Sequence, residues 1–301
     1  MKKIKSAIIG YGNIGKGVYE AIFTAPDMEL VGVVLRDKQM AAAKGVPPEL
    51  TVAEHVSELD GVELAFLCVP SRAVPSVAEE LLASGICTVD SYDIHGENLC
   101  KMRQNLNGVA KTSNSVAIIG VGFDPGIDSV FRCMFEAAAP KGITYTNYGP
   151  GMSLGHTVAV KAIAGVKNAL SMTIPLGTSL HRRMVYVELH NREDADAITR
   201  AIKNDPYFVN DETHVTVVDD VNALMDKGHG VNMVRKGVSG MTDNQMFEFD
   251  MRINNPAVTA QVMASAGRAA MRQLPGCYTI IEIPLIDLLP GEREGIVFRV
   301  V

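Results

Sequence analysis

The sequence predicts an α/β protein that begins with a doubly wound parallel sheet and continues into a second, α+β domain. Two observations carry this expectation. An apolar strand runs into the pattern G-x-G-x-x-G at residues 10–15, and a helix-like stretch and a second apolar strand follow within about 30 residues, as dinucleotide-binding βαβ units require. After residue 129 the strand-like segments suggest an open or mixed sheet with a couple of helices. We therefore expect a Rossmann-type sheet joined to a separate domain.

The first strand, predicted over residues 4–9, leads directly into the glycine pattern. There the first glycine allows a tight turn, the second lets backbone N–H groups approach a pyrophosphate, and the third lets the following helix lie close to the strand. The helix, predicted over residues 13–23, then turns its positive N-terminus toward the phosphates. A glycine-rich α/β turn without a nucleotide is the alternative. The residues expected to contact the cofactor here are Gly10, Tyr11, Gly12, Asn13, Ile14 and Gly15.

The end of the second strand, residues 30–34, indicates which nicotinamide cofactor is preferred. Sites for NAD usually place Asp or Glu there to bind the ribose 2′-hydroxyl, whereas the 2′-phosphate of NADP needs a cation. Arg36 can pair with a phosphate and stack on adenine, and Lys38 adds a second positive charge. The sequence therefore favours NADP. Asp37 leaves dual use of NAD open, and both cations could instead be solvated loop charges.

Three further apolar strands, which end near residues 69, 90 and 121, lead into loops with polar side chains. Because ligands bind beyond the carboxyl ends of parallel strands, these loops should line one cleft. Asp90 and Asp93 follow the second of these strands, and either carboxylate could hold an ammonium group or take a proton, while Asp124 is a further carboxylate at a strand end. For Asp90 a turn cap is the favoured alternative. The residues predicted to border the cofactor at these loops are Val69, Pro70, Ser71, Arg72, Ser91, Tyr92, Asp93, Phe123, Asp124, Pro125 and Gly126.

Helical spacing over residues 74–84 and 98–107 separates these strands, as a parallel sheet requires. Near the C-terminal end the pattern returns to a helix rich in small residues, which suits close packing against a sheet. We therefore predict a dinucleotide-binding domain at residues 1–121, rejoined by 256–301, and a substrate-binding and dimerisation domain at residues 122–255.

Composition argues against several classes of protein. A net charge of −6 without a basic run argues against a nucleic-acid partner. No stretch approaches 18 uninterrupted apolar residues, so no transmembrane helix is expected, and the basic start lacks a signal-peptide cleavage site. The five cysteines are odd in number and scattered, which indicates reduced thiols in a cytoplasm. No cluster of His, Cys and Asp has the spacing of a metal site.

With these motifs together, the chain resembles the meso-diaminopimelate D-dehydrogenases, in particular the shorter of the family's two subtypes. T-V-D-S-Y-D at residues 88–93, D-P-G at 124–126, G-P-G at 149–151 and G-H at 155–156 carry the resemblance, together with N-P at 255–256. It implies reversible, NADP-dependent oxidative deamination of the D-centre of meso-2,6-diaminopimelate to L-2-amino-6-oxopimelate and ammonia. A homodimer in bacterial lysine biosynthesis is implied as well.

The resemblance also implies roles for individual residues. Asp93 and Asp124 would hold the ammonium of the reacting D-centre, and a loop at residues 152–155 would receive the carboxylate beside it. Three residues would grip the distal L-centre carboxylate, with an asparagine near the distal amine. By strand alternation only one of Arg182 and Arg183 can face the cleft. The residues expected to bind substrate are Tyr148, Met152, Ser153, Leu154, Gly155, Thr173, Arg183, His229 and Asn255, with His229 placed in a loop that its flanking glycines make accessible.

Phe123 stands where the family commonly has Trp, and the chain contains no Trp. A smaller ring leaves room beside the D-centre, so the sequence leaves acceptance of other D-amino acids open. Two further alternatives remain. Another reductase with this architecture, such as a sugar or inositol dehydrogenase or dihydrodipicolinate reductase, is one, although the E-K-P lysine of the sugar and inositol enzymes is missing near residues 90–95. A nucleotide-sensing protein without turnover is the other.

Overall fold

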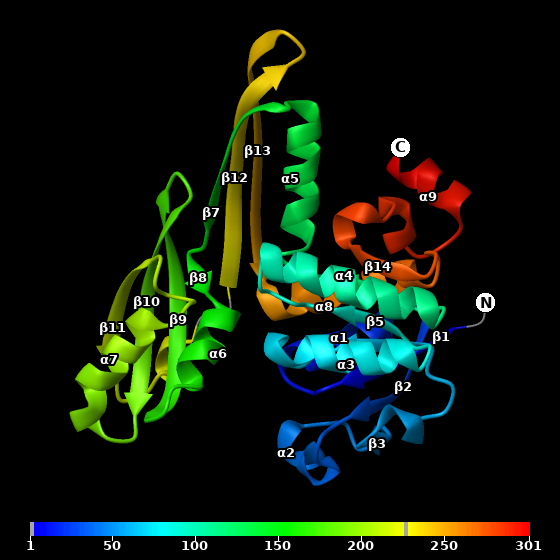
Figure 1. Cartoon of the computed structure of the whole chain (residues 1–301). Coiled ribbons are helices and arrows are strands. Elements are labelled where there is room, and N and C mark those ends of the chain that lie inside the picture. The colour runs from blue at the N-terminus through cyan, green and yellow to red at the C-terminus, as the bar shows by residue number, and fades with distance from the viewer. Residues whose placement is uncertain (1–2, 226–227) are drawn as a thin grey trace. The chain divides into compact units, whose positions relative to one another are not determined.

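The computed structural model describes residues 3–225 and 228–301, which fall into two compact units (Figure 1). Unit 1 contains the chain up to residue 130 together with residues 256–301, and unit 2 contains residues 131–255. The chain therefore leaves the first unit once and returns to it once.

Unit 1 is built on a seven-stranded sheet with the order β14-β6-β5-β4-β1-β2-β3, in which every neighbouring pair is parallel. The predicted α/β class is confirmed. The central strands are buried along almost their whole length, which explains why they read as continuous apolar runs rather than alternating ones. The strands are β1 Ile4–Ile9, β2 Met28–Val34, β3 Val52–Ala53, β4 Leu64–Leu67, β5 Cys87–Asp90, β6 Val116–Ile119 and β14 Gly276–Thr279.

Helices cover both faces of this sheet. On one face α1 and α8 bury Val18 and Met263 against Phe66, and on the other α3 and α4 bury Leu81 and Leu106. A Cβ at Gly267 of α8 would come within 2.9 Å of the Phe66 ring, so the small residues of α8 allow the close packing that the sequence predicts. The helices are α1 Asn13–Thr24, α2 Ala41–Lys44, α3 Val74–Ala83, α4 Glu97–Thr112, α8 Asn255–Ala270 and α9 Arg293–Val300.

Unit 2 contains two sheets rather than one. The four-stranded sheet, with the order β11-β10-β9-β8, is mixed because only β10 and β11 run parallel, and the three-stranded sheet β13-β12-β7 is antiparallel. Helices α6 and α7 pack on the four-stranded sheet through Val160, Ile198 and Ile202. The elements are α5 Ile127–Ala138, which crosses from unit 1, β7 Lys141–Tyr148, β8 Gly151–Met152, α6 Leu154–Lys161, β9 Val166–Gly177, β10 Leu180–Leu189, α7 Ala195–Asn204, β11 Glu212–Val217, β12 Gly228–Ser239 and β13 Thr242–Asn254.

The hairpin between β9 and β10 joins the two sheets of unit 2 through side chains. The backbone N–H of Thr146 on β7 donates to Ser179 Oγ at 2.6 Å, and the N–H of Tyr148 donates to His181 Nε2 at 2.8 Å. Ser179 has a left-handed φ of 66°, which aims the hairpin tip at β7. Residues of β9 and β10 are thereby held beside the end of β7.

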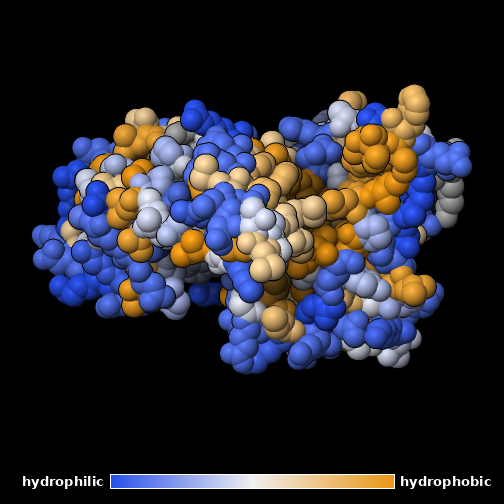
Figure 2. Space-filling view, turned by 90° about the horizontal axis from the view of Figure 1, so that it is seen from above, coloured by the Kyte–Doolittle hydropathy of each residue, from blue (hydrophilic) through white to orange (hydrophobic). Residues whose placement is uncertain are grey.

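The outer surface mixes hydrophilic residues with patches of hydrophobic ones (Figure 2). Leu274 and Phe298 are largely exposed in unit 1, and Met241 and Met246 are largely exposed in unit 2. Within residues 3–225 and 228–301, no helix combines the length and the apolar character needed to cross a bilayer.

Candidate active site

The glycine pattern between β1 and α1 forms the loop that the sequence predicts. Gly10 has φ +91°, and a Cβ there would lie 2.6 Å from the carbonyl oxygen of Cys68. A Cβ at Gly15 would lie 2.4 Å from the Gly10 carbonyl oxygen, so α1 can approach the strand only without a side chain at that position. By contrast, a Cβ at Gly12 would meet no atom within 4 Å. Gly12 thus borders open space at the N-terminus of α1, as a pyrophosphate site requires.

The charged residues after β2 are exposed on the surface of unit 1. Arg36 and Lys38 both lie in this exposed segment. The carboxylate of Asp37 accepts a hydrogen bond from the backbone N–H of Gln39 at 2.9 Å and so begins a short 3-10 helix. The carboxylate of Asp37 therefore bonds within its own turn. Arg36 and Lys38 are the two exposed cations at this strand end that can contact a phosphate.

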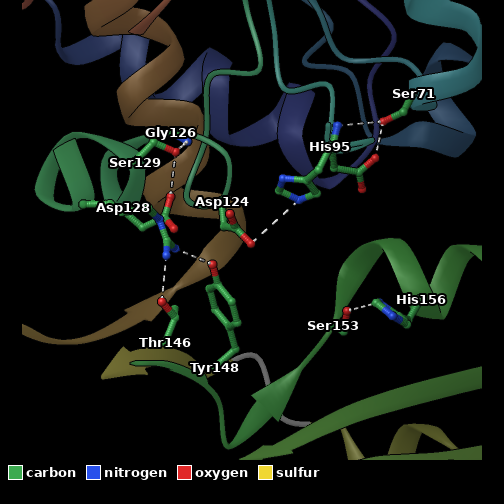
Figure 3. A network of polar contacts seen from close by, with 12 residues as sticks. Ser71, His95, Asp124, Gly126, Asp128, Ser129, Thr146, Tyr148, Ser153 and His156 are labelled. Atoms are coloured by element: carbon green, nitrogen blue, oxygen red, sulfur yellow. Dashed lines mark hydrogen bonds and ion pairs between the residues drawn. The ribbon is translucent and has the colours of Figure 1, made fainter. Parts of the chain in front are cut away.

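The loops after β4, β5 and β6 lie at one edge of the parallel sheet. Ser71 and Asp93 are bonded reciprocally: Ser71 Oγ donates to Asp93 Oδ1 at 2.6 Å, and the Asp93 N–H donates to Ser71 Oγ at 3.4 Å. His95 Nε2 lies 3.9 Å from Asp124 Oδ2, which brings the two aspartate-bearing loops into contact (Figure 3). Both candidate carboxylates are partly buried. Unit 1 thus gathers Ser71, Asp93 and Asp124 at the edge where ligands of parallel sheets bind.

Asp90 lies below these loops and is completely buried. Its Oδ1 accepts hydrogen bonds from the N–H groups of Tyr92 and Gly120, both at 3.0 Å. Burial raises the pKa of this carboxyl group to about 6, against the lowering effect of the two bonds. Asp90 therefore caps the turn that follows it, as the sequence predicts.

The loop after β6 is shaped by its glycines and by α8. Phe123 is buried, and its N–H donates to Thr259 Oγ1 of α8 at 3.2 Å. Gly126 has φ +149°, and a Cβ there would collide with the carbonyl of Gly122. The Gly126 N–H donates to Ser129 Oγ at 3.2 Å (Figure 3). This closed turn presents Asp124 at its tip.

In unit 2 a polar cluster surrounds Arg183 on β10. Arg183 pairs in register with Thr173 on β9, and its Nη1 donates to Thr173 Oγ1. Arg183 Nε donates to Asp211 Oδ2 at 2.6 Å. Arg182 turns to the other side of the strand, where it pairs with Glu212. The alternation therefore places Arg183, rather than Arg182, beside Thr173.

His229 differs from the sequence-based expectation. It lies on strand β12 and only 8% of it is exposed, so it is not an accessible loop histidine. Its two flanking glycines serve the close approach of backbones: a Cβ at Gly230 would lie 2.6 Å from the carbonyl oxygen of Met251, and the carbonyl oxygen of Gly228 lies where a Cβ of Gly151 would. Burial, helped by the positive charge of Arg183, lowers the pKa of His229 to about 4. His229 is therefore neutral at neutral pH.

The loop after β8 opens onto the N-terminus of α6. Ser153 precedes the helix, and its Oγ lies 2.7 Å from Nδ1 of His156 (Figure 3). Burial, followed by the charge of Arg183, lowers the pKa of His156 to about 4. Met152 is buried, whereas Ser153, Leu154 and Gly155 are partly exposed. The N–H groups at the start of α6 suit a carboxylate.

Unit 2 therefore links several of the predicted substrate residues to Arg183, directly or through its charge. Arg183 touches Thr173 directly, and its charge acts on His229 and His156. Tyr148 is connected to this cluster through His181, whose Nε2 accepts the Tyr148 N–H and whose pKa the charge of Arg183 lowers. Asn255 is the first residue of α8 and the last residue that belongs to unit 2 in the sequence.

Three members of these clusters did not emerge as functional residues from the sequence. Asp211 pairs with Arg183 from 28 positions away, and His181 accepts the Tyr148 N–H from 33 positions away, so only the fold brings these partners together. The third is Asp90, for which the sequence favours a turn cap over a role at an ammonium group. Among residues 3–225 and 228–301, no group of three or more His, Cys, Asp or Glu side chains is arranged to hold a metal ion.

Known proteins match this chain both in one segment and over nearly its whole length. Residues 122–182 match the family described as Diaminopimelic acid dehydrogenase C-terminal domain. A meso-diaminopimelate D-dehydrogenase of Bacteroides fragilis is 59% identical over 297 residues, which cover 98% of each chain. The structure of C. glutamicum DAP dehydrogenase in complex with DAP matches with a TM-score of 0.90 at 29% identity and covers 100% of both chains. An engineered D-amino acid dehydrogenase bound to NADP+ matches with a TM-score of 0.88 at 28% identity, again over 100% of both chains. The chain therefore belongs to the meso-diaminopimelate D-dehydrogenase family, and the resemblance read from its motifs is confirmed.

Proposed function

We propose that this protein catalyses the reversible oxidative deamination of the D-centre of meso-2,6-diaminopimelate, with NADP as cofactor, in lysine biosynthesis. The observation that carries the proposal is the 59% identity to a meso-diaminopimelate D-dehydrogenase along 98% of the chain. With NADP+ as hydride acceptor, the amino acid and water give L-2-amino-6-oxopimelate, ammonium, NADPH and a proton.

The residues around the glycine loop fit such a cofactor. The space beside Gly12 and the N-terminus of α1 suit a pyrophosphate, and Gly10 and Gly15 are required for that shape. Arg36 and Lys38, both exposed after β2, are assigned to the 2′-phosphate, which their positive charges suit. The predicted contacts at the three loops after β4, β5 and β6 belong to the same proposal.

Asp93 and Asp124 are assigned to the reacting amine. Two carboxylates at the edge of the sheet can hold an ammonium group by charge-assisted hydrogen bonds. The amine must lose a proton before its lone pair can help to expel the hydride, and a carboxylate, or a water that it holds, can accept that proton. Ser71 orients Asp93 through its short hydrogen bond. Water then attacks the substrate imine, and ammonia leaves.

The distal L-centre is assigned to the cluster around Arg183. Its guanidinium group and the hydroxyl of Thr173 can bind one carboxylate together, with neutral His229 as a further hydrogen-bonding group. Asp211 holds the guanidinium from its Nε side, so we assign its Nη groups, beside Thr173, to the substrate carboxylate. The N–H groups at the start of α6, near Ser153, are assigned to the carboxylate beside the D-centre. Asn255 is assigned to the distal amine.

The remaining parts of the proposal concern assembly and location. We assign residues 1–121 and 256–301 to dinucleotide binding and residues 122–255 to substrate binding and dimerisation. Exposed side chains such as Met246 and Phe298 are compatible with an interface in a homodimer. The scattered, odd number of cysteines supports a cytoplasmic location.

A broader D-amino acid dehydrogenase is the second candidate. Phe123 is smaller than the Trp expected at its position, and it is buried beside Asp124. Extra room at the D-centre would admit side chains other than that of diaminopimelate. The reaction would be the same, but the selectivity would be lower.

A substrate panel tests these assignments. The purified protein is incubated with meso-, LL- or DD-diaminopimelate or a simple D-amino acid, each with NADP+ or NAD+, and nicotinamide reduction is followed by absorbance. We expect meso-diaminopimelate with NADP+ to react fastest and the LL isomer, which lacks a D-centre, to be inert. Comparable rates with simple D-amino acids would favour the broader enzyme. Reaction with the LL isomer alone, or with no member of the panel, would contradict the proposed function.

A further inference from the structure

Asp90 is the fully buried carboxyl group at the end of β5, and the proposed reaction leaves it without a role. It is completely inaccessible to solvent, as is Thr88 two positions earlier on the same face of the strand. Burying a carboxyl group is costly unless hydrogen bonds compensate for it. Asp90 Oδ2 and Thr88 Oγ1 both lack a hydrogen-bond partner among the described residues, so the bonds of Asp90 are concentrated on Oδ1.

The bonds of Asp90 connect two loops rather than one. Its Oδ1 accepts from the N–H of Tyr92 in its own loop and from the N–H of Gly120 at the end of β6, both at 3.0 Å. Its carbonyl oxygen accepts from the N–H of Val121 at 2.8 Å. One residue therefore holds three N–H groups, two of which belong to the neighbouring strand end.

Each residue whose N–H group bonds to Asp90 is close in the sequence to one of the two proposed catalytic carboxylates. Tyr92 immediately precedes Asp93, and Gly120 and Val121 lead into the turn that presents Asp124. A Cβ built at Gly120, where φ is +62°, would lie 3.2 Å from the Pro125 ring, so the start of this loop packs against its tip. A displacement at Gly120 would thus reach Asp124.

We propose that Asp90 is a positioning residue that fixes the Asp93 and Asp124 loops relative to each other, so that both carboxylates meet the same amine. The inference rests on the proposed function, because it assumes that these two carboxylates act together. Asp90 itself touches neither substrate nor cofactor in this scheme. Its contribution is the shared acceptor Oδ1, and the negative charge of the carboxylate is not needed.

Three variants separate this role from a general contribution to folding. Asp90→Ala removes the acceptor, whereas Asp90→Asn keeps an oxygen at Oδ1 for both N–H groups. Thr88→Val is the matched control, since Thr88 is equally buried, lies on the same strand and has no partner for its Oγ1. We expect Asp90→Ala to lower kcat by about 10- to 100-fold, because a displacement of about 1 Å at a reacting group can cost that much. Asp90→Asn and Thr88→Val should keep kcat close to that of the unchanged protein.

Hydrogen exchange followed by mass spectrometry supplies a readout that does not depend on turnover. In Asp90→Ala, exchange should accelerate in peptides covering residues 91–95 and 119–126 and stay unchanged in α1. The proposal is overturned if Asp90→Ala retains full kcat, if Asp90→Asn is as impaired as Asp90→Ala, or if exchange rises throughout unit 1. Should the unchanged protein fail to oxidise meso-diaminopimelate, the proposed function fails, while the exchange experiment still reports whether Asp90 ties the two loops.

Discussion

Replacing His156 by phenylalanine should make unit 2 less sensitive to acid. The imidazole ring packs edge-on against Tyr207 and Phe208, with ring centroids 5.3 and 5.0 Å apart, so a phenyl ring suits the same space. Burial, with the charge of Arg183 as the second cause, lowers the pKa of His156 from 6.5 to about 4. The folded protein therefore resists protonation at this position, whereas the unfolded chain does not.

The sign and size of the effect follow from this difference in pKa. Because the folded pKa lies below the unfolded one, the unfolded chain binds the extra proton first, and stability present above pH 6.5 is lost as the pH falls toward 4. The shift corresponds to a loss of up to about 3 kcal/mol over that window. Phenylalanine removes this loss but also the hydrogen bond to Ser153, which is worth about 1 kcal/mol. The variant should thus be less stable at pH 7 and more stable near pH 4.

Native-state hydrogen exchange of α6 and α7 measures this crossover. The opening free energies of the two proteins are compared at the same pH between 4 and 8, which cancels the intrinsic pH dependence of exchange. His229 contributes equally to both proteins and also cancels. A replacement of His214, which is about half exposed on β11, serves as control. The difference in opening free energy between this variant and the unchanged protein should keep the same sign from pH 4 to pH 8. A difference between His156→Phe and the unchanged protein that does not vary with pH would refute the reasoning.

Further predictions concern substrate and cofactor binding. Arg183→Met should raise KM for meso-diaminopimelate by about 10- to 100-fold, as expected for charged hydrogen bonds worth about 1.5 to 3 kcal/mol, whereas steady-state kinetics of Arg182→Met should be nearly unchanged. Arg36→Ala should raise KM for NADP+ and leave KM for NAD+ almost unaffected, and equal effects on both cofactors would contradict the assignment to the 2′-phosphate. Gly12→Ala should weaken NADP+ binding with little change in Tm, since the added methyl group meets no protein atom. Gly15→Ala should lower Tm, because its Cβ would overlap the Gly10 carbonyl.

The nucleotide-binding part of the fold was predictable because its determinants are local. Gly10 and Gly15 lie five positions apart and contact each other, and the adjoining strand and helix have clear apolar periodicity. Asp90 was likewise predicted as a cap from its place before a turn, and its bond to Tyr92 spans two residues. Its second bond, to Gly120, spans 30 residues and required the order of strands in the sheet. Hydrogen bonds between residues close in the sequence could therefore be predicted, whereas the bond to a residue 30 positions away could not.

His229 shows why the substrate side was harder to predict. Glycines on both sides of a histidine are typical of a loop, but here the same small residues let neighbouring backbones approach a strand. An accessible loop and a closely packed strand therefore produce the same pattern of a histidine between two glycines. Family resemblance singled out His229 for the substrate, while local reasoning assigned it the wrong structure and exposure. Asp211 gave no local signal, because its partner Arg183 lies 28 positions away on β10.

The electrostatics around Arg183 connect its binding role with the architecture of unit 2. Burial lowers the pKa of His156, His181 and His229, and the positive charge of Arg183 lowers each further. A neutral His181 can accept the N–H of Tyr148, which a protonated ring could not do because both of its nitrogens would carry hydrogens. Arg183, which is assigned to a substrate carboxylate, thus also favours the neutral form of His181. The hydrogen bond that joins the two sheets at Tyr148 depends on that neutral form. For this reason the charge at position 183 bears on how the two sheets of unit 2 are joined as well as on the proposed binding of a carboxylate.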